Sequence, residues 1–419
     1  MNIKSIRVTN FKSFKELEVE FGKLNVVIGA NASGKSNFVQ IFKFTKDIEN
    51  HGLANAISMQ GGIEYLRNMN LSASEIFSLK VVSNQKYESI GSLTKEEIIG
   101  IKTYETTYEF ALKFRKSGLG FDIAKDILTQ KCNFVRLKTE KKGKIVEKEK
   151  LGEGEIIFSR NDSKLKIDLI KPKEIPINKD SIFPPFLQKE MLKKNTLLVG
   201  EAPTFFLSPL DKIFRNISIY DFDPKLPKKA ISITGKAELE EDGSNLSIIL
   251  KNIIENKEKR RKLFNLVKDL LPFISNLDVE KFAGKSLMFK LKEIYFKKQY
   301  LPASFISDGT INITALIVAL YFEKKKLTII EEPERNIHPY LVSKVVDMMK
   351  DASQKKQIIV TTHNPEIVKY AGLDNILLIS RDKEGFSTVS RPVDKKEVKT
   401  FLENEIGIEE LYVQNLLGV

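Results

Sequence analysis

Short apolar runs near the two ends of the chain predict buried strands. Residues 26–28 (Val-Val-Ile), 327–330 (Leu-Thr-Ile-Ile) and 357–363 (Gln-Ile-Ile-Val-Thr-Thr-His) are largely apolar and rich in β-branched side chains. Such runs are typical of strands that are covered on both faces of a sheet. Helical periodicity follows the first run at once, and Pro339 begins another helix after the second. This alternation of strands and helices predicts an α/β fold.

The middle of the chain has a different pattern. From about residue 78 to residue 170, apolar and polar residues tend to alternate, for example at 104–114. This is typical of strands with one charged and solvated face. Helical segments are expected to follow at 188–194 and 204–214. The middle region is therefore predicted to be β-rich at first and helical later.

A long helical pattern covers residues 246–271, but its apolar stripe lapses across the basic stretch 256–262. This part is either one helix with a solvated basic middle or two helices with a joint. The basic cluster is a candidate nucleic-acid contact, and a solvated helix face explains it at least as well.

The sequence Gly29-Ala30-Asn31-Ala32-Ser33-Gly34-Lys35-Ser36 joins the first buried run to its helix. Its Gly-x-x-x-x-Gly-Lys-Ser spacing, between a strand and a helix, is that of a phosphate-binding P-loop. The glycines let backbone N–H groups face an anion, and the helix N-terminus adds partial positive charge. Lys35 is expected to reach the β- and γ-phosphates, and the Ser36 hydroxyl to ligate Mg²⁺. A Gly-rich turn without a ligand is the weaker explanation.

Polar residues lie at the ends of the other two buried runs. Glu331 and Glu332 follow the run at 327–330, and His363 is the last residue of the run at 357–363. Ligands collect beyond the carboxyl ends of neighbouring parallel strands, so these residues are expected to meet. Glu331 is then a candidate Mg²⁺ ligand, and Glu332 is placed to orient and deprotonate an attacking water. A lone strand-end histidine is more often structural.

Two further turns carry polar groups. Ser307-Asp308-Gly309 precedes an apolar helix and offers exposed N–H groups to an anion, although alone it is only a good helix cap. Gln60 stands before Gly61 and Gly62, which makes a flexible joint with a polar amide; a plain helix-ending glycine is the alternative. Asp221 and Asp223 end a predicted strand and share a face, so they could hold a divalent metal. Strand ends and X-Pro turns also favour aspartate without any metal.

Composition narrows the setting. One cysteine among 419 residues excludes an intramolecular disulfide and fits a reducing compartment. With neither an apolar signal segment nor a run long enough to span a bilayer, a cytoplasmic protein without membrane contact is expected. The net charge of +13 suggests a polyanionic partner such as nucleic acid, although lysines spread over a surface bind nothing in particular.

The order of these motifs resembles that of the ABC-type ATPases of the SMC/RecF class, and more narrowly the AAA_21-type "predicted ATPase" branch related to OLD-family proteins. The resemblance implies an α/β P-loop NTPase fold of the ABC/SMC-head type. The core would comprise residues 1–75 and 297–419, and a β-rich and helical insertion at 76–296 would complete the head. ATP and Mg²⁺ would be the cofactors, and two heads would form a homodimer around ATP.

The resemblance also implies roles for single residues. Glu332 would be the catalytic base, His363 the switch histidine and Gln60 a Q-loop residue that touches the metal or the water. Ser36 and Glu331 would hold Mg²⁺. The remaining ATP-binding residues would be Gly29, Asn31, Ser33, Gly34, Lys35 and Asn37. The signature motif, which would reach the γ-phosphate in the partner subunit, would be Ser307, Asp308 and Gly309.

Three functions compete at this point. The first is an ATP hydrolase whose head dimerisation clamps nucleic acid or signals to a partner protein, in DNA repair or phage defence. The second is an ATP-dependent scaffold or sensor with little turnover that controls a separate effector. Glu331 favours it, because this class usually offers the metal an aspartate at that position. The third is a nuclease, which would need Asp221 and Asp223 to work alone, since the chain after His363 is too short for an appended nuclease domain.

Overall fold

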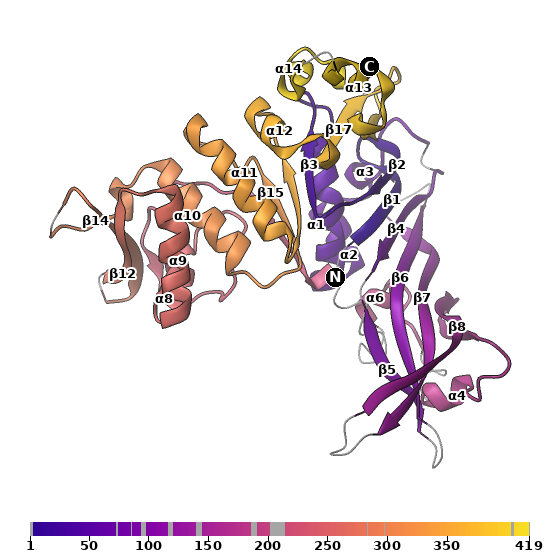
Figure 1. Cartoon of the computed structure of the whole chain (residues 1–419). Helices are drawn as coiled ribbons and strands as arrows, with labels where there is room; N and C mark the ends of the chain where they lie inside the picture. Colours follow the sequence, from indigo (N-terminus) through magenta and orange to yellow (C-terminus); the bar gives the residue numbers. More distant parts are fainter. Residues whose placement is uncertain are drawn as a thin grey trace. The chain divides into compact units, whose positions relative to one another are not determined.

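The computed structural model forms two compact units (Figure 1). One unit comprises Met1–Phe21, Ser36–Asn216 and Arg381–Val389, and the other comprises Gly22–Lys35, Ile217–Ser380 and Ser390–Val419. The described residues are 3–72, 74–84, 86–93, 98–115, 120–139, 145–185, 191–201, 214–282, 284–296, 298–403 and 406–418.

The helical segment expected at 188–194 is wrong in its described part, because residues 191–194 form no helix. Residues 188–190 and 204–213 lie outside the described residues. The division into a core at 1–75 and 297–419 and an insertion at 76–296 describes the order of the motifs along the chain, and it stays a prediction.

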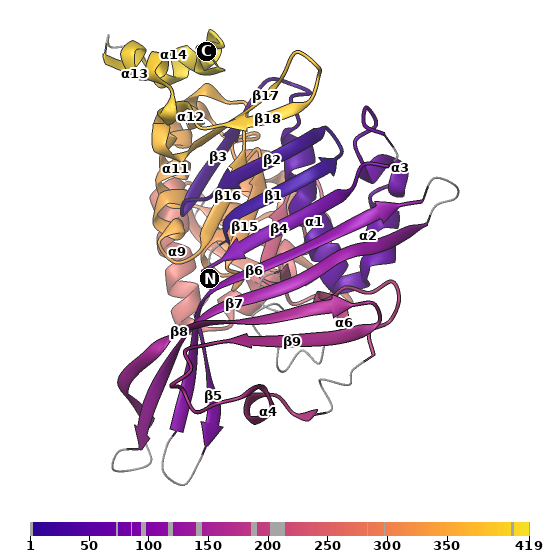
Figure 2. The ribbon, with the colours of Figure 1, turned by 90° about the vertical axis from the view of Figure 1, so that its right-hand side faces the viewer.

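The first unit is built on one antiparallel sheet, in which long neighbouring strands run side by side (Figure 2). The strand order is β2-β1-β4-β6-β7-β8-β9, and β5 pairs with β6. The strands are β1 (Ile3–Phe11), β2 (Phe14–Glu20), β4 (Phe77–Ser83), β5 (Tyr87–Leu93), β6 (Ile98–Phe114), β7 (Phe121–Thr139), β8 (Ile145–Asn161) and β9 (Lys164–Ile170). The helices are α1 (Lys35–His51), α2 (Leu53–Met59), α3 (Ile63–Leu66), α4 (Lys179–Ile182) and α6 (Leu198–Glu201). The predicted β-rich region is confirmed.

Aromatic side chains fill the core between the sheet and α1. The ring of Phe77 lies 5.8 Å from that of Phe44 and 5.7 Å from that of Phe110. Phe11 packs on both Phe44 and Phe77. These tilted and edge-on arrangements are favourable for aromatic rings, and each pair adds about 1 kcal/mol beyond the area it buries.

A buried charged group ties the strands of this unit together. Asp126 in β7 accepts hydrogen bonds from the Tyr108 hydroxyl at 2.9 Å and from the Leu198 backbone N–H at 2.8 Å. Its other neighbour is Arg160 of β8, whose Nε lies 3.5 Å away. Arg160 also donates to the backbone carbonyls of Lys193 and Thr196. One carboxylate thus links three strands to the segment that follows them.

The second unit contains a largely parallel sheet with the strand order β10-β15-β16-β3-β17-β18. The strands of this sheet are β3 (Leu24–Ile28), β10 (Ile217–Tyr220), β15 (Leu327–Glu331), β16 (Gln357–Thr361), β17 (Ile376–Arg381) and β18 (Ser387–Ser390). Arg381 and most of β18 are counted with the first unit. β3 and β16 are buried along their whole length, as the apolar runs predicted. The P-loop strand β3 lies next to β16, and β16 lies next to β15. The predicted α/β P-loop NTPase fold is confirmed.

Helices and a small antiparallel sheet complete this unit. The small sheet consists of β11 (Ile231–Ser232), β12 (Ile274–Phe282), β13 (Ser286–Glu293) and β14 (Leu301–Pro302). The helices are α8 (Leu246–Ile254), α9 (Lys257–Leu270), α10 (Asp308–Tyr321), α11 (Pro339–Ser353), α12 (Pro365–Ala371), α13 (Lys396–Glu403) and α14 (Ile408–Val413). Single 3₁₀ turns lie at Ala303–Phe305, Leu373–Asn375, Pro392–Asp394 and Leu416–Gly418. No helix in the described part of the chain has both the length and the hydrophobicity needed to cross a bilayer.

The joint between α8 and α9 settles one open alternative. Asn256 lies between the two helices, and its side chain accepts a hydrogen bond from the backbone N–H of Lys259. This is the arrangement of a helix N-cap, which satisfies a donor that the first turn leaves unpaired. The helical pattern at 246–271 therefore forms two helices, and the basic stretch begins the second.

Candidate functional site

The P-loop joins β3 to α1 in a conformation that depends on glycine. A Cβ atom on Gly29 would lie 2.2 Å from the backbone oxygen of Ile379 in β17, so no side chain fits there. Gly34 has φ +119°, a value that side-chain-bearing residues rarely adopt. The Ser33 N–H donates to the Ala30 carbonyl at 3.2 Å and tightens the loop. The loop therefore has the compact, glycine-dependent form that a phosphate cradle needs.

Lys35 is folded onto this loop. Its Nζ donates to the backbone oxygens of Gly29 at 2.8 Å and Ala30 at 3.0 Å. Burial lowers the pKa of Lys35, and the negative charge of Glu332 opposes that effect. The ammonium group is thus held beside the anion cradle, within electrostatic reach of the predicted catalytic base.

Ala32 is strained within the same loop. Its φ of 61° lies in the left-handed region, where a Cβ atom crowds the backbone. Glycine adopts this conformation without that penalty. Alanine at this position therefore has a conformational cost.

The end of β15 brings the predicted base and the predicted histidine together. Glu331 is the last residue of β15 and pairs with Thr361 of β16, and the Glu332 N–H donates to the Thr361 carbonyl at 2.8 Å. The Glu332 backbone then turns out of the strand with φ 45°. Its Oε1 lies 2.9 Å from Nδ1 of His363. The predicted proximity of the two strand ends is confirmed.

Arg335 occupies the other oxygen of the same carboxylate. It donates to Glu332 Oε2 from one terminal nitrogen at 3.1 Å and from Nε at 3.3 Å. Its second terminal nitrogen donates to Oδ1 of Asp221 at 2.9 Å. Asp221 therefore fixes Arg335, and Arg335 fixes Glu332 against His363. No local pattern in the sequence indicated this chain of contacts.

Asp221 and Asp223, the candidate metal ligands, both contact other groups of the protein. Asp221 pairs with Arg335, and Oδ1 of Asp223 accepts from the Lys225 N–H at 2.9 Å. Among the residues that the structure describes, no group of three or more His, Cys, Asp or Glu side chains is arranged to hold a metal ion. Both aspartates thus have protein partners.

Glu334 is a buried carboxyl behind the site. It is 8% exposed, and its Oε1 accepts a hydrogen bond from the Thr362 hydroxyl at 2.5 Å. Thr362 Oγ1 in turn accepts from the Asn364 N–H at 2.9 Å. Burial raises the pKa of Glu334, and the charge of Glu332 acts in the same direction. Glu334 therefore braces the turn that carries His363.

The Ser307-Asp308-Gly309 turn begins α10, as predicted. The Ser307 hydroxyl accepts from the Thr310 N–H at 3.3 Å, which is an N-cap. A Cβ atom on Gly309 would lie 2.5 Å from the backbone oxygen of Asn336, so the turn packs directly against the loop after β15. Asp308 forms an ion pair with Lys228 at 2.5 Å. This turn and the Glu332 loop are thus in contact within one unit.

Sequence comparison with known proteins agrees with this geometry. The profile of the AAA_21 family, described as "AAA domain, putative AbiEii toxin, Type IV TA system", matches residues 24–98 and 199–369, more than half of the chain. The chain belongs to the AAA_21 family. It is an ATPase of the SMC/RecF-like class, as its motifs suggested.

Similar proteins include one relative that covers most of the chain. An "ATP/GTP phosphatase" of Helicobacter pylori (strain ATCC 700392 / 26695) is 22% identical over 388 residues, which are 90% of this chain and 88% of that protein. The "DNA replication and repair protein RecF" of Clostridioides difficile (strain 630) is 44% identical over 41 residues, 10% of this chain and 11% of that protein.

Solved structures with a similar arrangement include SMC heads. One is described as an SmcHead bound to the C-winged helix domain of ScpA (TM-score 0.49, 17% identity, 93% of this chain and 98% of that chain). Another is the SMC head domain from Thermotoga maritima (TM-score 0.44, 12% identity, 93% and 99%).

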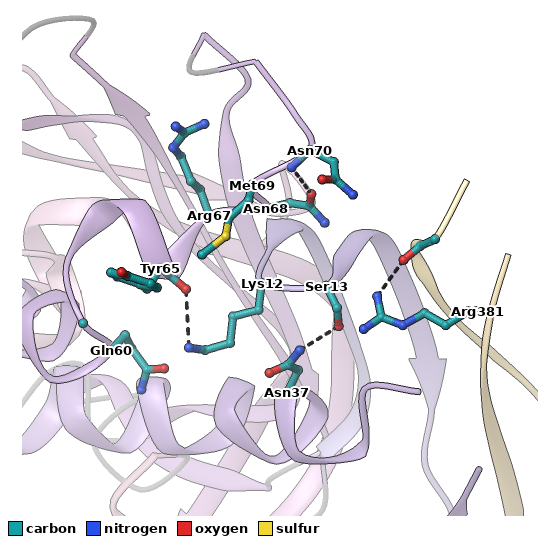
Figure 3. Close-up of a pocket in the computed structure, with 12 residues that line it drawn as sticks. Lys12, Ser13, Asn37, Gln60, Tyr65, Arg67, Asn68, Met69, Asn70 and Arg381 are labelled. Atoms are coloured by element: carbon teal, nitrogen blue, oxygen red, sulfur yellow. Dashed lines mark hydrogen bonds between the residues drawn. The ribbon is translucent and has the colours of Figure 1, made fainter. Parts of the chain in front are cut away.

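In this AAA_21 protein, Gln60 lies in the first unit, beside a cavity of about 670 Å³ (Figure 3). Gln60 caps the end of α2, is 7% exposed and donates from Nε2 to Gln40 Oε1 at 3.2 Å. Its Oε1 is buried and accepts no hydrogen bond within the described structure. An unpaired buried amide oxygen is costly, and a ligand or a water in the cavity would relieve that cost. This favours a polar role for Gln60 over a plain helix end.

The start of α1 borders the same cavity. Asn37 donates from Nδ2 to the Ser13 hydroxyl at 2.9 Å, while Ser36 is exposed one residue earlier. Lys12, whose pKa is lowered by burial, donates to the Tyr65 carbonyl at 3.4 Å. Three cations line this cavity and were missed by the sequence analysis: Lys12, Arg67 and Arg381. They come from separate segments, so no motif marked them.

Proposed function

We propose that this protein binds and hydrolyses ATP with Mg²⁺ and that its heads dimerise around the nucleotide. The main support is the position of Glu332, which is held between His363 and Arg335 and influences Lys35 electrostatically. Such a carboxylate, oriented by two donors near a phosphate cradle, suits a residue that accepts a proton from water.

The P-loop fits a triphosphate in several ways. Gly29 and Gly34 let the backbone curl, and Lys35 is already confined to the loop by two carbonyls. A bound triphosphate would compete for the Lys35 ammonium and draw it toward the β- and γ-phosphates. Ser36 and Glu331 would hold Mg²⁺, which supplies charge neutralisation at the phosphates when bound. Asn31, Ser33 and Asn37 would complete the nucleotide contacts.

In the proposed mechanism, Glu332 orients the attacking water and takes its proton. His363 holds one oxygen of Glu332, and Arg335 holds the other, so the base cannot rotate freely. Gln60 would accept a hydrogen bond from the water or ligate the metal through its unpaired Oε1. Ser307, Asp308 and Gly309 would offer the N-terminus of α10 to the γ-phosphate bound by a second copy of the chain.

Dimerisation would couple nucleotide state to an outside partner. The contact between the signature turn and the γ-phosphate is lost on hydrolysis, so ATP favours the closed pair. The closed pair would clamp nucleic acid or signal to an effector protein. The short similarity to RecF and the family description support DNA repair and phage defence as settings for this activity.

A scaffold or sensor with little turnover is the second candidate. Glu331 stands where this class usually has aspartate, and both oxygens of Glu332 already have cationic or imidazole partners. A base that is held this firmly would release its partners slowly, so the closed state would be long-lived.

Steady-state phosphate release separates the two candidates. Wild-type protein, Lys35→Ala, Glu332→Gln and the exposed-surface control Glu174→Gln would be compared with saturating Mg²⁺-ATP, with and without DNA. The hydrolase predicts measurable turnover that falls about 10³-fold in Glu332→Gln, in the range for loss of a catalytic proton acceptor, and is unchanged in Glu174→Gln. Wild-type turnover as low as that of Glu332→Gln, with ATP still bound, would instead support the sensor.

A further inference from the structure

A row of lysines lies at the amino ends of three neighbouring strands in the second unit. Lys23 directly precedes β3, Lys326 directly precedes β15 and Lys356 directly precedes β16. The backbone joins them in register, because the Gln357 N–H donates to the Lys326 carbonyl and the Ile358 N–H donates to the Lys23 carbonyl, both at 2.8 Å. Adjacent strands are about 4.8 Å apart, so these positions follow one another closely along the edge of the sheet.

This edge is opposite the nucleotide site. All strands concerned are parallel, and Lys35, Glu332 and His363 lie beyond their carboxyl ends. The lysine row therefore cannot be a part of the phosphate cradle. It needs a separate explanation.

Two more lysines extend the row. Lys355 comes from the turn before β16, and Lys262 comes from the basic start of α9. Nζ of Lys262 lies 5.0 Å from the ring centre of Tyr321 and 5.3 Å from that of Phe322, so aromatic faces hold it toward this edge. Helices α9 and α10 pack against each other here (Figure 1).

Lys356, Lys326, Lys262 and Lys355 also influence one another electrostatically. The pKa of Lys356 is lowered to about 8, mainly by burial and in smaller part by the charges of Lys326 and Lys262, while the charge of Glu323 opposes the shift. The pKa of Lys262 is likewise lowered by burial and by the charge of Lys355. Lys356 itself is buried and donates to the backbone oxygens of Ala319 and Glu323. Lys356 therefore has a structural role at this edge. The other four lysines are exposed: Lys23, Lys262, Lys326 and Lys355.

The exposed lysines of the row form no ion pair with a carboxylate within the described residues, whereas Lys228 and Lys325 of the same unit pair with Asp308 and Glu238. Asp351 acts on Lys262 electrostatically without forming an ion pair with it. Lys23 instead donates to the neutral amide of Gln354 at 2.9 Å. Their charge is therefore available to an external anion.

We propose that the lysine row (Lys23, Lys262, Lys326 and Lys355) binds the phosphodiester backbone of a nucleic acid. Several lysine charges gathered along one sheet edge suit the phosphates of a nucleic-acid backbone, and such contacts read no bases. The inference rests on the proposed function, because it names the partner and the contact surface of that ATPase. The lysine row lies at the edge of the sheet opposite Lys35. Nucleic-acid binding by the row and ATP hydrolysis at the P-loop can therefore be tested separately.

The test is fluorescence anisotropy with labelled duplex DNA, single-stranded DNA and single-stranded RNA at several salt concentrations. Lys23→Gln, Lys326→Gln and Lys355→Gln would be combined in one variant. The control, Lys148→Gln, Lys164→Gln and Lys173→Gln, removes the same charge from exposed positions in the other unit. The row variant is expected to bind at least one probe about 10-fold more weakly, with the log–log salt slope reduced by about 2, and the control to stay within about 3-fold of wild type.

Several outcomes would overturn the proposal. They are equal weakening in both triple variants, unchanged binding in the row variant, and absence of wild-type binding to all three probes. Circular dichroism checks that each variant is folded, and Lys262→Gln alone replaces the triple variant should it unfold. The Lys35→Ala protein is expected to keep nucleic-acid binding while losing phosphate release, so a failure of the ATPase proposal remains distinguishable from a failure of this one.

Discussion

Two carboxylates, one in each unit, have similar partners and opposite settings. Asp126 is 1% exposed and is surrounded by Tyr108, Leu198 and Arg160. The side chain of Glu332 is 31% exposed and is held by His363 and Arg335. Water reaches only the second carboxylate. Both carboxylates have an arginine neighbour, so the ion pair alone does not reveal their role. The comparison shows that burial distinguishes the structural carboxylate from the one that can take part in chemistry.

Burial also decides how much each ion pair contributes to the stability of the fold. Removing one member of a buried ion pair leaves an uncompensated charge and typically costs about 3–5 kcal/mol. A partly exposed pair contributes little to stability because water screens it, typically less than about 1 kcal/mol. Asp126 is therefore expected to matter for folding, and Glu332 for chemistry.

Asp126→Ala should have the largest effect on stability. The change removes the acceptor of the Tyr108 hydroxyl and the Leu198 N–H and leaves Arg160 without its carboxylate, so the free energy of unfolding at neutral pH should fall by about 3 kcal/mol. Denaturant titration followed by circular dichroism measures this. Glu332→Ala is the matched comparison and should change stability by less than about 1 kcal/mol. Equal destabilisation by the two variants would contradict the claim that Asp126 matters for folding and Glu332 for chemistry.

The pH dependence of stability should also trace to Asp126. Burial raises its pKa to about 6, while an unfolded aspartate titrates near 3.9. Between these values the folded state binds more protons than the unfolded state, so this contribution to stability falls as pH rises from about 4 to 6 and is constant above. The difference in unfolding free energy between wild type and Asp126→Asn should therefore change by roughly 2–3 kcal/mol across this pH range. A difference that does not vary with pH would show that the Asp126 pKa is not raised.

Arg335→Gln should lower turnover about 10-fold with little change in KM. The variant leaves Glu332 charged but free to rotate, and a tenfold loss corresponds to about 1.4 kcal/mol of transition-state stabilisation. Arg335→Lys should recover only part of the rate, because lysine cannot hold Glu332 and Asp221 at once. Asp221→Asn should lower turnover less than Arg335→Gln does. Added to Arg335→Gln, it should cause no further loss of turnover. Independent, additive losses would mean that Asp221 does not act through Arg335.

The smallest effect is expected from Ala32→Gly. Glycine relieves the strain at φ 61°, which costs a residue with a Cβ atom roughly 1–2 kcal/mol, and part of this gain is offset by the greater freedom of unfolded glycine. We expect a net stabilisation of about 0.5 kcal/mol and a small rise in Tm by calorimetry. A lower Tm would show that the loop tolerates alanine without strain.

The sequence predicted those features that leave a local pattern. β3, β15 and β16 are apolar because the sheet is covered on both faces, and the P-loop spacing is fixed by backbone geometry. The lapse of the apolar stripe near Asn256 was compatible with one helix or with two, and the structure shows the joint between α8 and α9 there.

Contacts between distant segments left no such pattern. Asp221 and Arg335 are 114 residues apart in sequence, and nothing in either segment marks the other. Likewise, Lys23, Lys326 and Lys356 precede three different strands and become neighbours only through the strand order. Glu334 lies two residues after Glu332, and only its burial and its contact with Thr362 distinguish its role from that of the exposed carboxylate.

The central claim is that Glu332 hydrolyses ATP held between two copies of the chain, and the Glu332→Gln protein tests it most directly. Its molar mass would be measured by light scattering after gel filtration, with saturating Mg²⁺-ATP, with Mg²⁺-ADP and without nucleotide. We predict a dimer with ATP alone, and a monomer again when Ser307→Arg is added to block the signature turn. A Glu332→Gln protein that binds ATP yet stays monomeric, or a dimer that ignores both nucleotide and Ser307→Arg, would contradict the account.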